Sequence, residues 1–235
     1  MNSNPSWLYD EFRHIGTNYE SDAEVEAYDL RMQKLRDVQS EAKKILCLLD
    51  LESDHTLIEI GTGTGEFAIA AARKCSKVIA IDVSESMLKY AKKKAIARDI
   101  KNIRFIHAGF LAYEHQDNKV DAVVTQLAMH HLPDFWKQVA LLRISEIIRP
   151  EGKLYLKDII YSFDPKKSKS FFERYITELS TTEKGGTRYF IKHVKEEYST
   201  LTWIMEGMLD KAGFRIDGID KQDELIAAYL CSKIG

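Results

Sequence analysis

A chain of 235 residues is long enough for one domain with a full core, or for one domain that carries a cap. Hydrophobic residues make up 45% and charged residues 30%, as in ordinary globular proteins, and a net charge of −2 does not favour nucleic acid as a partner. No apolar stretch approaches the roughly 20 residues of a membrane span, and no signal-peptide pattern begins the chain. Three well-separated cysteines, without a C-x-x-C pair, predict buried free thiols in a reducing cytoplasm.

Helical signals dominate the first fifty residues. Ser21-Asp22-Ala23-Glu24 has the form of a capping box, so a helix is expected to begin there. Apolar residues then recur at spacings of three and four as far as Leu49, which predicts one helix or two with a single apolar face. We expect residues 1–50 to form an N-terminal helical lid and residues 51–235 to form the core domain.

The stretch from Leu57 to Ala72 is the one around which the chain is organised. Its apolar start, residues 57–60, predicts a strand buried in a parallel sheet, and helix-forming residues follow from Phe67. Three glycines separate strand and helix at alternate positions: Gly61, Gly63 and Gly65. Such glycines are needed where the chain turns sharply or where a ligand presses on bare backbone, and the following helix directs free N–H groups to the same place.

A second apolar run, residues 78–81, ends at Asp82, which lies 21 residues after Gly61. A carboxylate in this place can accept hydrogen bonds from both hydroxyls of a ribose. The loop reads G-x-G-x-G, whereas dinucleotide-binding folds have G-x-G-x-x-G. Together, Glu59, the three glycines and Asp82 resemble the class I S-adenosylmethionine-dependent methyltransferases. The structural alternative is an ordinary tight turn followed by an N-capping aspartate.

The resemblance implies a doubly wound α/β fold with a mostly parallel, seven-stranded, Rossmann-like sheet, an antiparallel last strand and a helical cap. It also implies S-adenosylmethionine as cofactor and S-adenosylhomocysteine as product. The residues that it would place at the cofactor are Glu59, Gly61, Thr62, Gly63, Gly65, Asp82, Val83, Met87, Gly109, Phe110, Gln126 and Leu127.

In the resembled family, N-terminal helices lie across the cofactor cleft. The resemblance therefore implies that the ring of Tyr28 contacts the methionyl chain and that Arg31 binds its carboxylate. A core tyrosine and a solvated arginine are the alternative. Further along, Ser84 predicts the start of a helix to about Arg98, whose lysines are expected to form a solvated face rather than a nucleic-acid patch.

The ends of the third and fourth predicted strands complete the expected site. Many family members have Gly-Asp after strand three, with the acid on the adenine amino group, but this chain has Gly109-Phe110. Backbone groups around residues 108–111 would then contact the adenine in place of the acid, and Phe110 would pack beside the adenine ring. Residues 126–134, after strand four, resemble the loop beneath the sulfonium in small-molecule methyltransferases related to the quinone-methylating group. The adjacent histidines of this loop point apart, and without a second ligand cluster we expect no metal.

The C-terminal part carries a change of pattern. A helix over 135–148 and a strand over 153–158 are followed by a lysine-rich and aromatic stretch, which predicts an inserted helical cap at about 159–195. Its aromatic residues are expected to form the core of the cap rather than a substrate box. A last helix and a hairpin over 214–219 and 226–231 are expected to close the fold. The residues of the helix expected to face inward are Trp203, Ile204, Met208 and Leu209.

The implied activity is in-line transfer of a methyl group from S-adenosylmethionine to a small-molecule acceptor. The chain lacks both the Asn/Asp-Pro-Pro-aromatic motif of amino-methylating DNA enzymes and the Pro-Cys of cytosine-C5 enzymes. A base is needed only if the acceptor must lose a proton, and the candidates are His131, Asp158 and Tyr161. A silent S-adenosylmethionine-binding module and an NAD-dependent oxidoreductase are the alternatives, and the sequence leaves a homodimer open.

Overall fold

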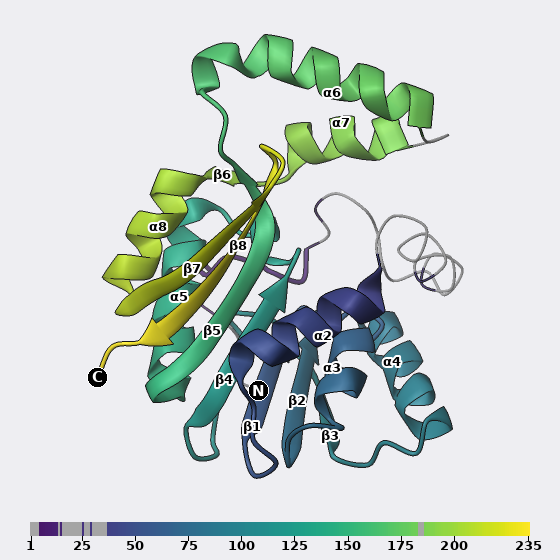
Figure 1. Ribbon diagram of the computed structural model, residues 1–235, viewed down its shortest axis with the longest axis vertical. Coiled ribbons are helices and arrows are strands. Elements are labelled where there is room, and N and C mark those ends of the chain that lie inside the picture. Colours follow the sequence, from purple (N-terminus) through teal and green to yellow (C-terminus); the bar gives the residue numbers. More distant parts are fainter. Residues whose placement is uncertain (1–4, 14, 16–24, 26–28, 30–36, 183–185) are drawn as a thin grey trace.

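The computed structural model describes residues 5–13, 15, 25, 29, 37–182 and 186–235 (Figure 1). The elements of its first half are α2 (Val38–Leu49), β1 (Thr56–Ile60), α3 (Glu66–Ala71), β2 (Lys77–Asp82), α4 (Glu85–Ala97), β3 (Ile103–His107), β4 (Val120–Gln126) and η1 (Met129–His131). The second half contains α5 (Asp134–Ile147), β5 (Ile148–Tyr161), η2 (Pro165–Lys167), α6 (Ser168–Thr182), α7 (Gly186–Glu196), β6 (Thr200–Leu201), α8 (Thr202–Lys211), β7 (Phe214–Gln222) and β8 (Ile226–Lys233).

One mixed sheet holds the fold together. Its strand order is β3-β2-β1-β4-β5-β8-β7, and the short strand β6 pairs with β5 beside this path. The first five strands run parallel, whereas β8 is antiparallel to both β5 and β7. The predicted seven-stranded, mostly parallel sheet with an antiparallel last strand is therefore confirmed, with β6 as an addition that the sequence did not suggest.

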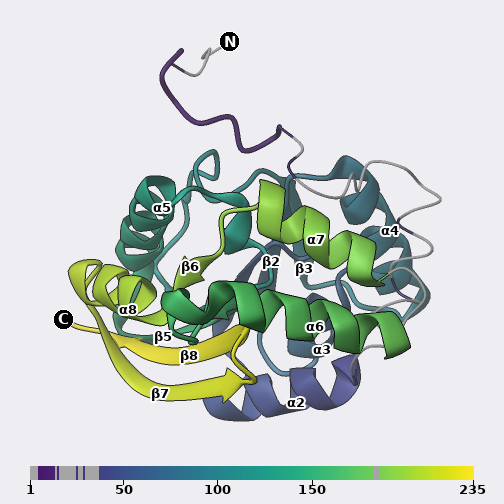
Figure 2. The same ribbon diagram turned by 90° about the horizontal axis from the view of Figure 1, so that it is seen from above.

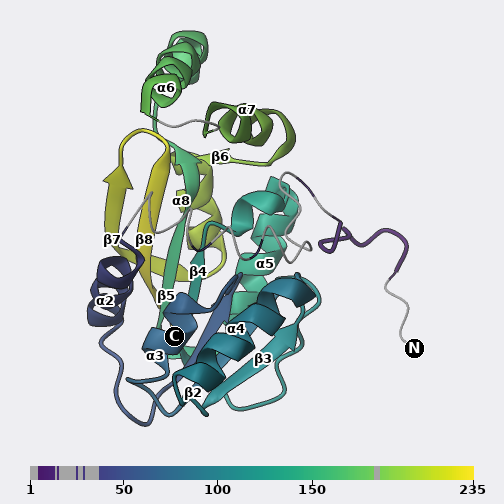
Figure 3. The ribbon, with the colours of Figure 1, turned by 90° about the vertical axis from the view of Figure 1, so that its right-hand side faces the viewer.

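The central strands are buried on both faces because helices cover both faces of the sheet. Leu57 and Ile58 of β1 are both fully buried but belong to different clusters, since successive side chains point to opposite faces. One cluster joins the sheet to α2 and α3, and the other joins it to α5 and α8. Figure 3 shows the sheet nearly on edge, with α2 on one side and α5 on the other.

The helix α2 packs as part of this layered body. Its buried residues Ala42, Ile45 and Leu49 belong to the same cluster as strands β1, β2 and β4. A lid that ends at residue 50 would assign this helix to the cap over the cofactor, and the packing instead lays it on the sheet. The division of the chain into lid and core remains a prediction for the residues before 37.

Helices α6 and α7 form a cap beyond the carboxyl ends of the strands (Figures 1 and 2). The inner side chains of the cap make a small aromatic core of their own, in which the rings of Phe163 and Phe171 stack at 4.1 Å between centroids. This is the arrangement expected for aromatic residues at helical spacing inside a cap. Leu225, from the turn between β7 and β8, fastens the cluster to the sheet.

Two expectations about single side chains are wrong. Trp203 is 69% exposed rather than inward, because α8 presents Met205, Met208 and Leu209 to the core instead. Cys47 is exposed, while Cys75 and Cys231 are buried free thiols as expected. Within the described residues, no helix has the length and apolar character needed to cross a membrane.

Candidate functional site

The strand order reverses between β1 and β4, and open α/β sheets bind ligands in the crevice at such a point. The glycine loop that follows β1 lies there. Gly61, Gly63 and Gly65 all have left-handed backbone, with φ of 80°, 51° and 78°. A Cβ on Gly61 would stand 2.4 Å from the Cβ of Ala128, so this glycine allows the loop after β4 to approach. A Cβ on Gly63, in contrast, would have no atom of the described residues within 4 Å.

Asp82, at the end of β2, holds this loop in place. One carboxylate oxygen accepts a hydrogen bond from the Gly63 N–H at 2.7 Å, and the other accepts from the Ser84 N–H at 2.9 Å. Burial raises the pKa of Asp82, and the two N–H donors act against that rise. A carboxylate has about four acceptor positions, so Asp82 keeps acceptor capacity for a ligand beside the open space at Gly63.

Two further predicted residues support the same loop. Glu59, buried at the end of β1, accepts a hydrogen bond from the Thr62 hydroxyl at 2.6 Å. Ser84 caps α4 by accepting from the Met87 N–H at 3.2 Å, as predicted, and the Met87 side chain is buried behind the loop. Val83, which follows Asp82, is exposed at the mouth of the crevice.

The end of β3 brings in a residue that sequence reasoning missed. The Glu11 carboxylate accepts hydrogen bonds from the backbone N–H groups of Leu111 and Ala112, and the shortest of them, from Ala112, is 2.6 Å. A Cβ on Gly109 would stand 2.2 Å from this carboxylate and 2.8 Å from the Val83 side chain. The predicted backbone donors near Phe110 are therefore engaged by an acid from the N-terminal segment. Burial raises the pKa of Glu11, and these backbone donors oppose the rise.

The end of β4 closes the opposite side of the crevice. Gln126 ends the strand, and Leu127 takes a left-handed conformation with φ of 52°. The Leu127 N–H donates to the Lys157 carbonyl at 2.7 Å, which fixes this sharp turn against β5. Non-glycine residues in this conformation cost of order 1–3 kcal/mol and cluster at functional sites, so the turn is consistent with a site at this position.

Tyr28 and Arg31 lie outside the described residues. Asp29, which stands between them in the sequence, is described, and its carboxylate accepts a hydrogen bond from the Thr64 hydroxyl at 2.5 Å. The N-terminal segment thus reaches the glycine loop at this residue. Asp29 also pairs with Lys94 at 2.6 Å, so this lysine of α4 belongs to a half-buried ion network and not to a solvated face.

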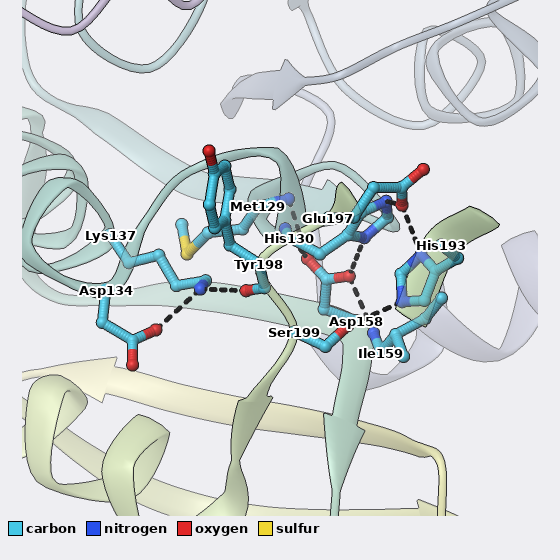
Figure 4. Close-up of polar contacts among 10 residues, drawn as sticks. All are labelled: Met129, His130, Asp134, Lys137, Asp158, Ile159, His193, Glu197, Tyr198 and Ser199. Carbon is cyan, nitrogen blue, oxygen red and sulfur yellow. Dashed lines mark hydrogen bonds and ion pairs between the residues drawn. The ribbon is translucent and has the colours of Figure 1, made fainter. Parts of the chain in front are cut away.

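A polar cluster lies where β4 and β5 end below α7, and we define it as His130, Asp158, His193, Glu197 and Ser199 (Figure 4). Asp158 is 2% exposed and accepts hydrogen bonds from three backbone N–H groups: Met129, His130 and Ile159. Its second oxygen also accepts from His130 Nδ1 at 2.5 Å. Burial would raise the pKa of Asp158, but the charge of His130 holds it below its ordinary value.

Glu197 and His193 complete the polar cluster from the end of α7. The second ring nitrogen of His130 lies 3.2 Å from Glu197 Oε2, and His193 Nδ1 contacts the same oxygen. His193 Nε2 in turn lies 2.7 Å from the Ser199 hydroxyl. Burial alone would lower the pKa of His130, but Asp158 and Glu197 raise it to about 9. The i,i+4 spacing of His193 and Glu197 was the available signal, and it was overlooked.

The three candidate bases differ in what surrounds them. Asp158 is engaged on both oxygens. The imidazole of His131 makes no hydrogen bond within the part of the chain that the structure describes, and burial together with the charge of His130 lowers its pKa to about 4. Burial raises the pKa of Tyr161, which packs against Phe163 at the edge of the cap.

The cap and the N-terminal segment both meet the loop that follows β4. The Tyr198 N–H donates to the His130 carbonyl at 2.8 Å, and the buried ammonium of Lys137 donates to the Tyr198 carbonyl and to Asp134. The Tyr9 hydroxyl donates to the His131 carbonyl at 3.1 Å. Segments from two distant parts of the sequence therefore converge on His130 and His131.

Comparison with known proteins gives consistent matches. Residues 57–152 match the family described as a methyltransferase domain. An uncharacterized methyltransferase of Geobacillus kaustophilus is 26% identical over 193 residues, which cover 82% of this chain and 83% of the relative.

Two solved structures share the fold. A S-adenosylmethionine-dependent methyltransferase from Aquifex aeolicus superimposes with a TM-score of 0.62 at 18% identity, over 91% of this chain and 99% of that chain. A mycolic acid cyclopropane synthase, solved with S-adenosylhomocysteine, gives a TM-score of 0.63 at 14% identity, over 83% of each chain.

Proposed function

We propose that this chain is a class I S-adenosylmethionine-dependent methyltransferase and that it methylates a small-molecule acceptor by in-line transfer. The observation that carries the proposal is the covered position of the strand ends. The helix α7 lies over them, and the two residues that follow it, Glu197 and Tyr198, contact His130. Strand ends that are covered by a helical cap suit a small acceptor better than a macromolecule.

The cofactor would lie across the crevice between the glycine loop and the ends of β2, β3 and β4. The open space at Gly63 would take the methionyl part, and the free acceptor positions of Asp82 would take the ribose hydroxyls. Val83, Met87 and Phe110 would enclose the adenine. The remaining contacts that the sequence predicts would line the loop and the methionyl end: Glu59, Gly61, Thr62, Gly65, Gly109, Gln126, Leu127, Tyr28 and Arg31.

Glu11 would supply the carboxylate that position 110 lacks. It lies beside Gly109 and Val83, at the end of the crevice assigned to adenine, and its oxygens can accept from an exocyclic amino group as well as from backbone.

Replacing Glu11 is expected to weaken cofactor binding. Glu11→Ala should raise the Kd for S-adenosylhomocysteine by about tenfold or more, because one charge-assisted hydrogen bond contributes about 1.5–3 kcal/mol. Calorimetry measures this, with the exposed neighbour Asp10→Ala as a control that keeps its affinity. Tighter binding by Glu11→Ala would contradict the assignment, because it would mean that the side chain occupies the adenine position.

The transfer reaction needs little acid–base catalysis from the protein. An electron pair of the acceptor forms the new bond to the methyl carbon while the S–CH₃ pair returns to sulfur, which leaves S-adenosylhomocysteine. The sulfonium is already a good leaving group, so alignment and exclusion of water carry most of the rate. His131 faces the acceptor side with an uncharged ring, and Asp158 acts through His130 as a positioning residue. Tyr161 remains a candidate for contact with the acceptor.

Label transfer tests the proposed function. The full chain, incubated with methyl-labelled S-adenosylmethionine and a fractionated metabolite extract, should move label into a low-molecular-mass product, while added protein and DNA stay unlabelled. Binding of S-adenosylmethionine without label transfer to any fraction would support the silent module instead. Binding of NAD with no binding of S-adenosylmethionine would contradict the cofactor assignment altogether.

A further inference from the structure

Three side chains at the acceptor end have the composition of a metal site. Single ligand atoms of His130, His131 and Glu197 all lie within 4.8 Å of one another. We propose that these three residues bind one divalent transition-metal ion of the Zn²⁺ type, with a coordination position left open toward the acceptor. Because Zn²⁺ holds nitrogen and oxygen ligands at about 2.0–2.2 Å in a tetrahedral site, the three atoms would move closer together when they bind an ion.

His130 is already oriented as a ligand. Its Nδ1 donates to Asp158, and Asp158 is itself fixed by three backbone N–H groups at the start of η1 and the end of β5. This arrangement places the proton on Nδ1 and directs Nε2 toward Glu197. A carboxylate behind a histidine in this way is the usual outer-shell partner of metal-binding histidines, because it sets the tautomer and raises the basicity of the ligand.

Glu197 has an outer shell of its own. His193 contacts its Oε2, and the Ser199 hydroxyl lies on the other nitrogen of His193. Figure 4 shows Asp158 and His193 flanking the space between His130 and Glu197. Two separate supports, one from β5 and one from α7, thus orient two groups toward the same point. A simple ion pair between His130 and Glu197 would not need both of these supports.

His131 is the least expected member of the group. No other hydrogen-bonding group among the described residues satisfies its ring, although His130 packs against it at 4.3 Å between centroids. Coordination of an ion would give this ring a partner beside the two other ligand atoms.

The donor set selects the class of ion. Two imidazoles and one carboxylate suit Zn²⁺ and neighbouring transition metals, whereas Mg²⁺ and Ca²⁺ prefer oxygen ligands. Three protein ligands also match metal centres that keep a position for a substrate. The sequence did not predict this site because Glu197 comes from beyond the cap helix, about 65 residues after the histidines in the chain. The metal site does not rest on the proposed function, whereas its use to bind an acceptor does.

Metal titration of the full chain, without a histidine tag and after chelator treatment, tests the site. Calorimetry with Zn²⁺ should give one ion per chain, and Co²⁺ should give the visible absorption of a low-symmetry nitrogen and oxygen site. His131→Ala and Glu197→Gln should each weaken Zn²⁺ binding by about 100-fold, and His193→Ala should weaken it by about tenfold to 100-fold. S-adenosylhomocysteine binding by the same variants reports separately on the fold and on the cofactor site.

A second His/Asp/Glu group provides the matched control. Glu52, Asp54 and His55 lie close together in an exposed turn far along the chain from the cap, so His55→Ala should leave Zn²⁺ binding unchanged. The proposal is overturned if the wild-type chain binds no stoichiometric ion, or if His131→Ala and Glu197→Gln bind Zn²⁺ like wild type. It is also overturned if binding is lost in His55→Ala instead.

Discussion

Gly63→Val is expected to remove measurable binding of S-adenosylmethionine and S-adenosylhomocysteine, a loss of more than about 100-fold in affinity, while the protein stays folded. A Cβ on Gly63 would meet no described atom within 4 Å, so we expect the new side chain to fill the region assigned to the methionyl part of the cofactor. Left-handed backbone at a non-glycine residue costs roughly 1–2 kcal/mol, which a folded domain of this size tolerates. Calorimetry and thermal unfolding measure the two quantities separately.

Two other glycines control this experiment. Gly213, after α8, has φ of 80°, and an added Cβ would come close only to the flexible end of Lys233, with Ser145 Oγ at ordinary contact distance. Gly213→Ala therefore introduces a left-handed non-glycine residue away from the cofactor site. It should lose stability and keep its affinity. Gly61→Ala, in contrast, would drive a Cβ into Ala128 and should disturb the fold itself. If Gly63→Val loses helical structure and binding in parallel, Gly63 is needed for the fold and not for the ligand.

The parts of the fold that were predictable depend on short stretches of sequence. The buried strand, the alternate glycines and the helix after them lie within sixteen residues, and Asp82 follows at a fixed distance because one helix and one strand separate it from the loop. The Ser84 cap was predictable for the same reason, since its partner is only three residues away. Each of these signals is read within one turn, one strand or one βα unit.

The residues that were missed come from far along the chain. Glu11 reaches the backbone of Leu111, which is 100 residues away, and Glu197 reaches His130 across the whole of β5 and the cap. A glutamate in a polar segment is typical of a solvated surface, so composition gave no reason to bury either side chain. Only the path of the backbone places them at the strand ends, and no periodicity encodes that path.

The helix α8 shows the same limit from the apolar side. Periodicity gave its inward face correctly for Met208 and Leu209 but also assigned Trp203 to it, at the first turn, where the chain has just left β6. The direction in which a first turn points is set by the strand before it. Because β6 has only two residues and pairs at the edge of the cap, the sequence carried no signal for it.

Asp82→Ala is expected to lower cofactor affinity by about 100-fold or more and also to loosen the glycine loop. Two charge-assisted hydrogen bonds to a ribose contribute about 1.5–3 kcal/mol each. The substitution also leaves the N–H groups of Gly63 and Ser84 without their acceptor, so part of the loss comes from the loop and part from the ribose. Asp82→Asn keeps one acceptor oxygen and should lose less affinity, by about tenfold.

A comparison of two ligands separates the two contributions. Wild-type protein should bind S-adenosylhomocysteine more tightly than its 2′-deoxyribose analogue, since the analogue lacks one donor to Asp82. Asp82→Ala should bind the two ligands alike, because the acceptor for the missing hydroxyl has gone, whereas a loosened loop weakens both by the same factor. Should Asp82→Ala keep the full preference for the ribose form, the hydroxyl is recognised by another residue. Asp82 would then act on the cofactor only through the Gly63 backbone that it holds.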